Sequence, residues 1–230
     1  MRNEAGGGRA AARGRAMPVE IKICGLSDEA TLDAALDAGA SHVGFVSFPK
    51  SPRHVDIPRA RALADLARGR AAIAVLTVDA DDAALDALVE AIDPDVLQLH
   101  GHETPERTAA VKARFDREVW KAIPVATADD LAAIALYQSV VDRVLFDAKP
   151  PKGAVLPGGN GVAFDWGLLA ALDPSLRFVL SGGLTPENVA EAVARTRAPA
   201  VDVSSGVESA PGVKDQDRIR AFVRAVRSDG

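Results

Sequence analysis

The stretch Glu20-Ile21-Lys22-Ile23-Cys24-Gly25 is a short β-branched run that closes on glycine, and a helical pattern follows it. The same succession of strand-like run, polar or glycine turn and helical pattern occurs eight times along the chain. Such alternation predicts parallel strands joined by right-handed crossovers. Eight units in 230 residues match the size of an α/β fold with a single domain, the (β/α)8 TIM barrel. The predicted strands are Glu20–Gly25, His42–Ser47, Ala71–Leu76, Val96–Gly101, Glu118–Ile123, Arg143–Ala148, Phe178–Gly183 and Ala200–Gly206.

The composition limits the class of protein. A hydrophobic content of 48% in 230 residues is enough for the core of one such domain. The net charge of −5, without a dominant basic face, argues against nucleic-acid binding. No apolar run reaches the roughly 18 residues of a membrane span, so no membrane partner is expected. A single cysteine cannot build a disulfide framework, which favours a reducing, cytoplasmic compartment.

The segment before the first strand has a different character. It carries four arginines and the triple glycine Gly6–Gly8, and it lacks the apolar core of a secretory signal. We expect residues 1–18 to be a disordered N-terminal extension and residues 19–230 to form the barrel domain. A start codon assigned upstream of Met17 is the alternative.

Two long loops follow the second and sixth predicted strands. The stretch from Lys149 to Ala163 is rich in glycine and proline, and we expect it to be a mobile lid over the catalytic face. The stretch Phe48–Pro58 carries Arg53, whose guanidinium can offer a two-pronged contact to a carboxylate. Both loops leave the C-terminal ends of strands, the face on which barrel enzymes build their active sites.

Cys24 and Asp147 are the candidate chemical groups. Side chains alternate along a strand, so Cys24 and Lys22 share one face while Ile21 and Ile23 share the face expected to meet the helices. Cys24 would then point into the barrel mouth, close before a predicted helix whose N-terminus would stabilise a thiolate. Asp147 ends an apolar strand, and a carboxyl held at the edge of a core keeps its proton, which suits a general acid. The alternatives are a buried structural cysteine and a loop-capping aspartate.

Glycine-containing turns follow the last two predicted strands. In barrels of this kind, the backbone N–H groups of these two turns commonly hold a phosphate. One such turn would be weak support, because glycine also makes ordinary turns, but both occur at the expected places. The candidate phosphate-binding residues are Gly182, Gly183, Ser204, Ser205 and Gly206.

Three further polar residues occupy strand positions whose side chains are expected to point into the barrel. Asp202 lies on the same face as Ser204, and Gln98 lies on the same face as His100. Asp202, Gln98 and His100 are therefore candidates for substrate contact, although His100 could equally be a hydrogen-bonded core histidine. The other histidines have no metal-ligand spacing with one another or with Cys24, so we expect no metal site.

The motifs together resemble the phosphoribosylanthranilate isomerase family of tryptophan biosynthesis. The resemblance covers the chain from Glu20 to its C-terminus, with every motif in order. The matching segments are Lys22–Gly25, Gly44–Val46, Pro49–Arg53, Gln98–Gly101, Leu145–Asp147, Pro157–Gly161, Phe164–Trp166, Leu180–Leu184 and Val201–Glu208.

The resemblance implies a function and roles for single residues. That family converts the aminoaldose N-(5-phosphoribosyl)anthranilate to an aminoketose by an Amadori rearrangement, without a cofactor. The motif positions imply that Cys24 is the general base, that Asp147 is the general acid, and that Arg53 meets the anthranilate carboxylate. Asp202 would contact the anthranilate amine, and the two glycine turns would hold the phosphate. We expect a monomer or a homodimer, with this small molecule as the partner.

Two other functions compete with this one. The related aminoaldose isomerase of histidine biosynthesis has an aspartate where Cys24 stands and an internal half-barrel repeat that is not evident here. A catalytically silent barrel that binds phosphoribosyl ligands is the second. Such a barrel would need neither Cys24 nor Asp147, so their joint presence favours an enzyme.

Overall fold

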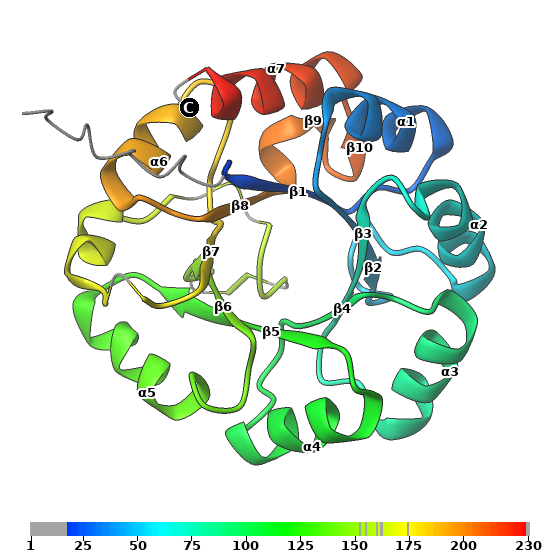
Figure 1. The fold of residues 1–230 in the computed structure, drawn as a ribbon, viewed down its shortest axis with the longest axis horizontal. Helices are drawn as coiled ribbons and strands as arrows, with labels where there is room; N and C mark the ends of the chain where they lie inside the picture. Colours follow the sequence, from blue (N-terminus) through cyan, green and yellow to red (C-terminus); the bar gives the residue numbers. More distant parts are fainter. Residues whose placement is uncertain are drawn as a thin grey trace, which may run out of the picture.

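Eight parallel strands close into a barrel in which β1 pairs with both β2 and β8. Figure 1 looks down this barrel, with the strands as an inner ring and the helices outside it. The predicted (β/α)8 fold is therefore confirmed. The strands are β1 (Glu20–Cys24), β2 (His42–Ser47), β3 (Ala72–Thr77), β4 (Val96–Leu99), β5 (Glu118–Val125), β6 (Arg143–Ala148), β7 (Phe178–Leu180) and β8 (Ala200–Val203).

The structure is a computed structural model that describes residues 18–151, 153–154, 156–159, 161, 163–173 and 175–228. The predicted N-terminal extension, residues 1–18, lies outside this part of the chain except for Pro18. Four positions of the predicted lid loop, Lys152, Val155, Asn160 and Val162, also lie outside it. That the extension is disordered and that the loop after the sixth strand is a mobile lid therefore remain predictions.

Helices cover the outside of the barrel, but not after every strand. The sixth crossover carries only a short 3-10 helix, η2 (Trp166–Ala171), so the expectation of a helix after each strand is wrong at this place. Within the described ranges, no helix has an apolar stretch long enough to cross a bilayer. The α-helices are α1 (Glu29–Ala38), α2 (Ile57–Ala67), α3 (Asp82–Ile92), α4 (Pro105–Phe115), α5 (Ile134–Tyr137), α6 (Val189–Thr196) and α7 (Gln216–Arg227), and a 3-10 turn η1 (Ala128–Ala133) precedes α5.

The chain between β8 and α7 contains structure that the sequence pattern did not predict. A 3-10 turn, η3 (Ser205–Val207), leads into an antiparallel hairpin made of β9 (Glu208–Ala210) and β10 (Val213–Lys214). Figure 1 shows this hairpin beside α7 and α1, next to the strand that closes the barrel. Residues of the hairpin therefore approach the mouth of the barrel close to β1.

Strand alternation divides the core into two parts. Ile21 and Ile23 belong to the large cluster between strands and helices, and both are fully buried. A second, smaller cluster fills the barrel itself, so the interior is packed rather than open. It comprises Ala74, Val96, Trp120, Ala122, Leu145, Val179 and Ala200.

The end of the barrel at which the strands begin is closed by an aromatic and ionic cluster. The guanidinium of Arg143 lies 5.2 Å from the centre of the Trp120 ring. Arg143 also donates to Glu20 and Glu118, at 2.7 and 2.8 Å. Chemistry that involves the strand ends is thereby confined to the opposite face.

The barrel core generates a stability prediction. Leu145 is fully buried in the inner cluster, so Leu145→Ala leaves a cavity and should lower the free energy of unfolding by about 2–5 kcal/mol. Leu136→Ala is the matched control, because 61% of Leu136 is exposed, and it should change that energy by less than about 0.5 kcal/mol. Urea denaturation followed by circular dichroism measures both. Equal losses in the two variants would contradict a tightly packed barrel interior.

Candidate active site

A cavity opens at the C-terminal ends of the strands and gathers most of the predicted site residues. Gly182 and Gln98 are the two candidates that do not line it. Gln98 is fully buried one layer deeper, so a direct contact between Gln98 and a ligand is not supported by its position. The candidates on the cavity wall are Cys24, Arg53, His100, Asp147, Gly183, Asp202, Ser204, Ser205 and Gly206.

Cys24 ends β1 with its side chain on the cavity side, as the alternation predicts. Only 3% of the residue is exposed. Lys22, two residues earlier on the same face, is also buried, and its ammonium lies 2.8 Å from a carboxylate oxygen of Asp202 on β8. Burial alone would lower the pKa of Lys22, but Asp202 and Cys24 outweigh it, so the pKa of Lys22 is raised and the side chain is charged.

The surroundings of Cys24 raise the pKa of its thiol, whereas the sequence predicts a stabilised thiolate. Burial raises the pKa of the Cys24 thiol above its ordinary value, and Asp202 adds to this, while the charges of Lys22 and Lys214 act against it. The predicted help from a helix N-terminus is not the main influence, because α1 begins only at Glu29. The Asp28 side chain caps that helix by accepting from the Thr31 N–H group. Buried ammonium groups, not the helix dipole, stabilise the thiolate here.

Asp147 is the second-last residue of β6 and belongs to a chain of three hydrogen-bonded polar side chains. One carboxylate oxygen of Asp147 lies 3.1 Å from Nε2 of His100, and the other accepts the N–H of Ala148 at 2.9 Å. The Nδ1 atom of His100 lies 3.1 Å from the Gln98 amide nitrogen. His100 therefore contacts both Asp147 and Gln98, and Gln98 reaches Asp147 only through the His100 ring.

The Gln98 amide permits two arrangements of this chain. Its oxygen has no hydrogen-bond partner in the described part of the chain. With the amide nitrogen toward His100, the ring accepts at Nδ1 and donates from Nε2 to an ionised Asp147. With the amide reversed, Nδ1 donates to the amide oxygen, and Nε2 accepts a hydrogen bond from the O–H of a neutral Asp147 carboxyl. Both protonation states of Asp147 thus find a hydrogen-bonded partner, which suits a group that gives up a proton and regains it.

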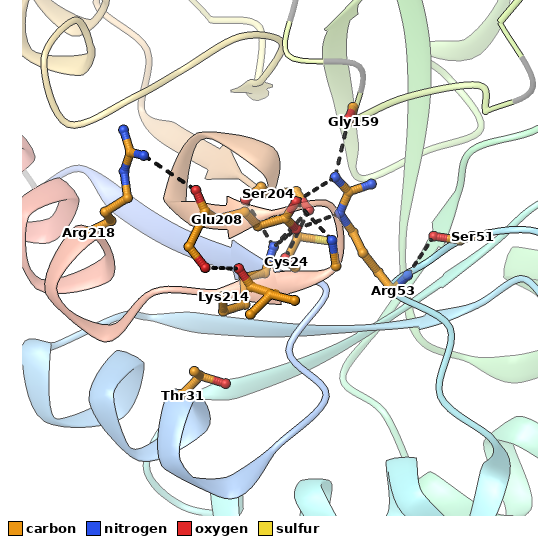
Figure 2. Close-up of polar contacts among 12 residues, drawn as sticks. Cys24, Thr31, Ser51, Arg53, Gly159, Ser204, Glu208, Lys214 and Arg218 are labelled. Carbon is orange, nitrogen blue, oxygen red and sulfur yellow. Dashed lines mark hydrogen bonds and ion pairs between the residues drawn. The ribbon is translucent and has the colours of Figure 1, made fainter.

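Arg53 lies on the cavity wall, but two nitrogen atoms of its guanidinium group already donate hydrogen bonds to another side chain. Its Nε atom donates to Glu208 at 2.7 Å and its Nη2 atom donates to the other Glu208 oxygen at 2.9 Å, as Figure 2 shows. Nη2 also donates to the Gly159 carbonyl at 3.3 Å. The two-pronged contact that the sequence predicts for a ligand carboxylate is made with a carboxylate of the protein itself.

The two glycine turns lie where the prediction places them. Gly183 has a φ of +66°, in the left-handed region that favours glycine. At Gly206 a Cβ atom would lie 1.8 Å from the Leu184 carbonyl oxygen, so the turns after β7 and β8 touch only because this residue is glycine. The Ser204 hydroxyl is already engaged, since it donates to the Cys24 carbonyl at 3.1 Å. Backbone N–H groups, rather than the Ser204 hydroxyl, are the available anion donors of these turns.

The described residues of the loop after β6 lie against the site. A Cβ atom on Gly158 would lie 2.4 Å from Asp147 Oδ2 and 2.5 Å from His100 Nε2. The next glycine, Gly159, contacts Arg53 through its carbonyl. This loop therefore touches both the candidate acid and the candidate carboxylate-binding residue.

Sequence reasoning missed three charged residues of the site: Lys22, Glu208 and Lys214. Lys22 had a signal, because it shares the inward parity of Cys24. Glu208 had a signal as the last residue of the matching segment Val201–Glu208, whereas Lys214 had none, since it lies in the hairpin that no pattern predicted. Among the described residues, no group of histidine, cysteine, aspartate and glutamate side chains is arranged to hold a metal ion.

Comparison with known proteins gives a consistent result. The family model described as N-(5'-phosphoribosyl)anthranilate isomerase matches residues 21–225. The protein of that name from Rhodopseudomonas palustris strain BisA53 is 61% identical over 212 residues, which cover 92% of this chain and 97% of that protein.

Solved structures agree with the sequence comparison. The phosphoribosyl anthranilate isomerase of Thermotoga maritima superposes with a TM-score of 0.83 at 33% identity, covering 91% of this chain and 99% of that one. A phosphoribosyl anthranilate isomerase in complex with reduced 1-(o-carboxyphenylamino)-1-deoxyribulose 5-phosphate superposes with a TM-score of 0.80 at 31% identity, with the same coverage.

The buried lysine generates a prediction about Cys24. Lys22→Met removes a positive charge that favours the thiolate and leaves Asp202 unpaired, and both effects raise the pKa of the Cys24 thiol. Alkylation by iodoacetamide, which consumes the thiolate, should therefore require higher pH and be slower at neutral pH. Intact mass reports the reaction cleanly because Cys24 is the only cysteine.

The control is Lys112→Met, which removes a half-exposed lysine paired with Asp142. It should leave the pH profile of alkylation unchanged. A profile that moves in neither variant would show that Lys22 does not influence the thiol.

Proposed function

The chain belongs to the N-(5'-phosphoribosyl)anthranilate isomerase family and is an aldose–ketose isomerase of tryptophan biosynthesis, and we propose that Cys24 and Asp147 are its acid–base pair. The reaction converts N-(5-phosphoribosyl)anthranilate to 1-(2-carboxyphenylamino)-1-deoxyribulose 5-phosphate. One observation carries the assignment. The thiol from β1 and the carboxyl from β6 line the same cavity, which the two glycine turns also border. A binding protein would need the turns but neither of the other two groups.

The substrate has two anionic ends, and the cavity offers a place for each. The phosphate is assigned to the backbone N–H groups of the turns after β7 and β8, at Gly183, Ser205 and Gly206. The anthranilate carboxylate is assigned to Arg53. A related enzyme binds a reduced product analogue that carries both groups, which supports a ligand of this shape. The ribose then lies between the two ends, within reach of Cys24 and Asp147.

The first step opens the furanose ring. Asp147 gives its proton to the ring oxygen, the bond between this oxygen and C1 breaks, and the nitrogen lone pair forms an iminium at C1. The ionised Asp147 can then accept from His100, in the arrangement with the Gln98 amide nitrogen toward the ring. His100 and Gln98 are assigned as positioning residues that serve Asp147 in both of its protonation states.

The second step moves a proton from C2. The iminium draws electrons and acidifies the C2 proton, which the Cys24 thiolate removes to give an enolamine. The Cys24 thiol then gives its proton to C1 of the enolamine and becomes the thiolate again, while the proton of the C2 hydroxyl passes to the Asp147 carboxylate as the ketone forms. The iminium is the electron sink. Asp202, held by Lys22, is assigned to the anthranilate amine.

We also propose a place and an assembly state. One cysteine in the chain and the absence of a basic face support a cytoplasmic enzyme that acts on a small molecule. A monomer or a homodimer is the expected state, and one related enzyme is described as dimeric. Sedimentation equilibrium distinguishes the two.

The acid–base pair generates the central prediction. Cys24→Ser keeps the size of the side chain but replaces the thiol by a much weaker acid, and Asp147→Asn keeps the shape but removes the transferable proton. Each variant should lower kcat for N-(5-phosphoribosyl)anthranilate by about 100-fold or more, with a much smaller change in KM.

Turnover is followed by the fluorescence of the anthranilate group, on variants whose thermal melting matches the parent protein. Near-normal kcat in folded Cys24→Ser would exclude the thiolate as the base. Alkylation of Cys24 should also inactivate the enzyme, and bound substrate should protect it.

The glycine turns generate a prediction about phosphate. Gly183→Val adds bulk at a backbone position with a φ of +66°, so it should raise KM about tenfold or more while kcat changes little. Inorganic phosphate should compete with the substrate. Gly39→Val is the matched control, because Gly39 has a φ of +93° at the end of α1, with no atom within 4 Å of an added Cβ. An unchanged KM in folded Gly183→Val, with no inhibition by phosphate, would remove this assignment.

A further inference from the structure

Glu208 is a buried carboxylate to which the reaction gives no role. It begins the hairpin strand β9, and only 4% of its side chain is exposed. It accepts from Arg53 through both oxygens, from the Lys214 ammonium at 2.7 Å, and from the Gly212 N–H group at 3.2 Å. The network can be followed in Figure 2. A carboxylate with this many donors holds a fixed orientation, and it fixes its partners in turn.

Lys214 ties this cluster to the rest of the site. Its fully buried ammonium donates to the Ser204 carbonyl at 2.9 Å and contacts the Ser204 hydroxyl at 3.1 Å. That hydroxyl donates to the Cys24 carbonyl. The cluster therefore joins the loop after β2, the turn after β8 and the end of β1. A displacement of Glu208 would change the orientation of Arg53 most, because Arg53 has no other charged partner among the described residues.

One edge of the Arg53 guanidinium, between Nη1 and Nη2, has no charged partner in the described part of the chain, and on it Nη2 donates to the Gly159 carbonyl at 3.3 Å. Nε and one N–H of Nη2 face Glu208, whereas Nη1 has no partner in the described part of the chain. Nη1 lies beside the loop after β6, since a Cβ atom on Gly159 would come within 2.7 Å of it. The Nη1–Nη2 edge, not the Nε–Nη2 edge, is therefore the edge that a ligand carboxylate can reach, by displacing the Gly159 carbonyl from Nη2.

The charges of the cluster also favour an incoming anion. Arg53 and Lys214 contribute two positive charges, and Glu208 contributes one negative charge. Burial disfavours the ionised form of Glu208, but these two cations outweigh it, so the pKa of Glu208 is lowered and the group is a carboxylate. Burial lowers the pKa of Lys214 while Glu208 acts against this shift, and one positive charge of the pair Arg53 and Lys214 has no counter-charge inside the cluster. A carboxylate on the ligand would balance it.

We propose that Glu208 is a positioning residue for Arg53 and thereby sets the preference of the enzyme for an aromatic amine that carries an ortho carboxylate. Glu208 holds the Nε–Nη2 edge so that the Nη1–Nη2 edge faces the carboxylate of the substrate. Lys214 fixes Glu208 from the other side and supplies the uncompensated charge. This inference rests on the proposed function, because it concerns which part of that substrate Arg53 recognises.

The test compares two substrates in Glu208→Gln. One is N-(5-phosphoribosyl)anthranilate, and the other is the analogue made from aniline, which lacks the carboxylate; both form by condensation of the amine with ribose 5-phosphate. Glutamine cannot accept from Nε and Nη2 together, so Arg53 loses its fixed orientation. The expected loss of kcat/KM is roughly ten- to a hundredfold for the anthranilate substrate, mostly in KM, and at most about threefold for the aniline substrate.

Two further variants complete the experiment. Arg53→Met should show the same loss for the anthranilate substrate alone, and adding Glu208→Gln to it should cost little more, because the two residues act as one unit. Glu29→Gln is the control, since Glu29 pairs with Arg59 at the surface and should alter neither substrate. Equal losses of kcat/KM on both substrates in folded Glu208→Gln, or no loss on either, would overturn the proposal. Failure of the parent protein to turn over N-(5-phosphoribosyl)anthranilate would instead overturn the proposed function.

Discussion

The closure of the barrel is the constraint on which the rest of the structure depends. Because β1 pairs with β8 as well as with β2, no strand of the barrel has a free edge, and every side chain on a barrel strand faces either the helices or the interior. On β1 this places Ile21 and Ile23 outside the barrel and Lys22 and Cys24 inside it. A change of one residue in register would bury the isoleucines in the mouth and send the thiol to the helices. The position of the reactive group is thus fixed by the same hydrogen bonds that hold the fold.

Closure also explains why the mouth contains so many buried charges. The barrel below is filled with apolar side chains, so polar groups at the strand ends have little water and must find partners in each other. Lys22 pairs with Asp202, and Glu208 pairs with both Arg53 and Lys214. Asp147 and His100 make a third group with Gln98. In the proposed function these three groups serve, in this order, the amine, the carboxylate and the ribose ring of the substrate.

The local sequence pattern was sufficient to predict features that depend on the alternation of side chains along a strand and on where each strand ends. It placed Cys24, Asp147 and the two glycine turns on one face, because parallel strands bring their C-terminal ends together. It could not show that Arg53 is held by Glu208, since the two residues are far apart in the chain and the hairpin that carries Glu208 has very short strands. It also could not show the direction of the pKa shift at Cys24, because the pKa of a buried thiol depends on its burial and on every charge around it. Nor could it show that Gln98 lies below the cavity wall, because parity gives the face of a strand but not the depth along it.

The loop after β6 has a thermodynamic consequence. The backbone of Gly158 lies against Asp147 and His100, and the carbonyl of Gly159 accepts from Arg53. A ligand that reaches these side chains must first replace contacts that the chain makes with itself, so binding is an exchange rather than a simple addition. The loop acts as a tethered competitor, and the measured affinity is weaker than the intrinsic affinity of the uncovered site. The same competition favours departure of the product, because the contacts that the ligand displaced form again as it leaves.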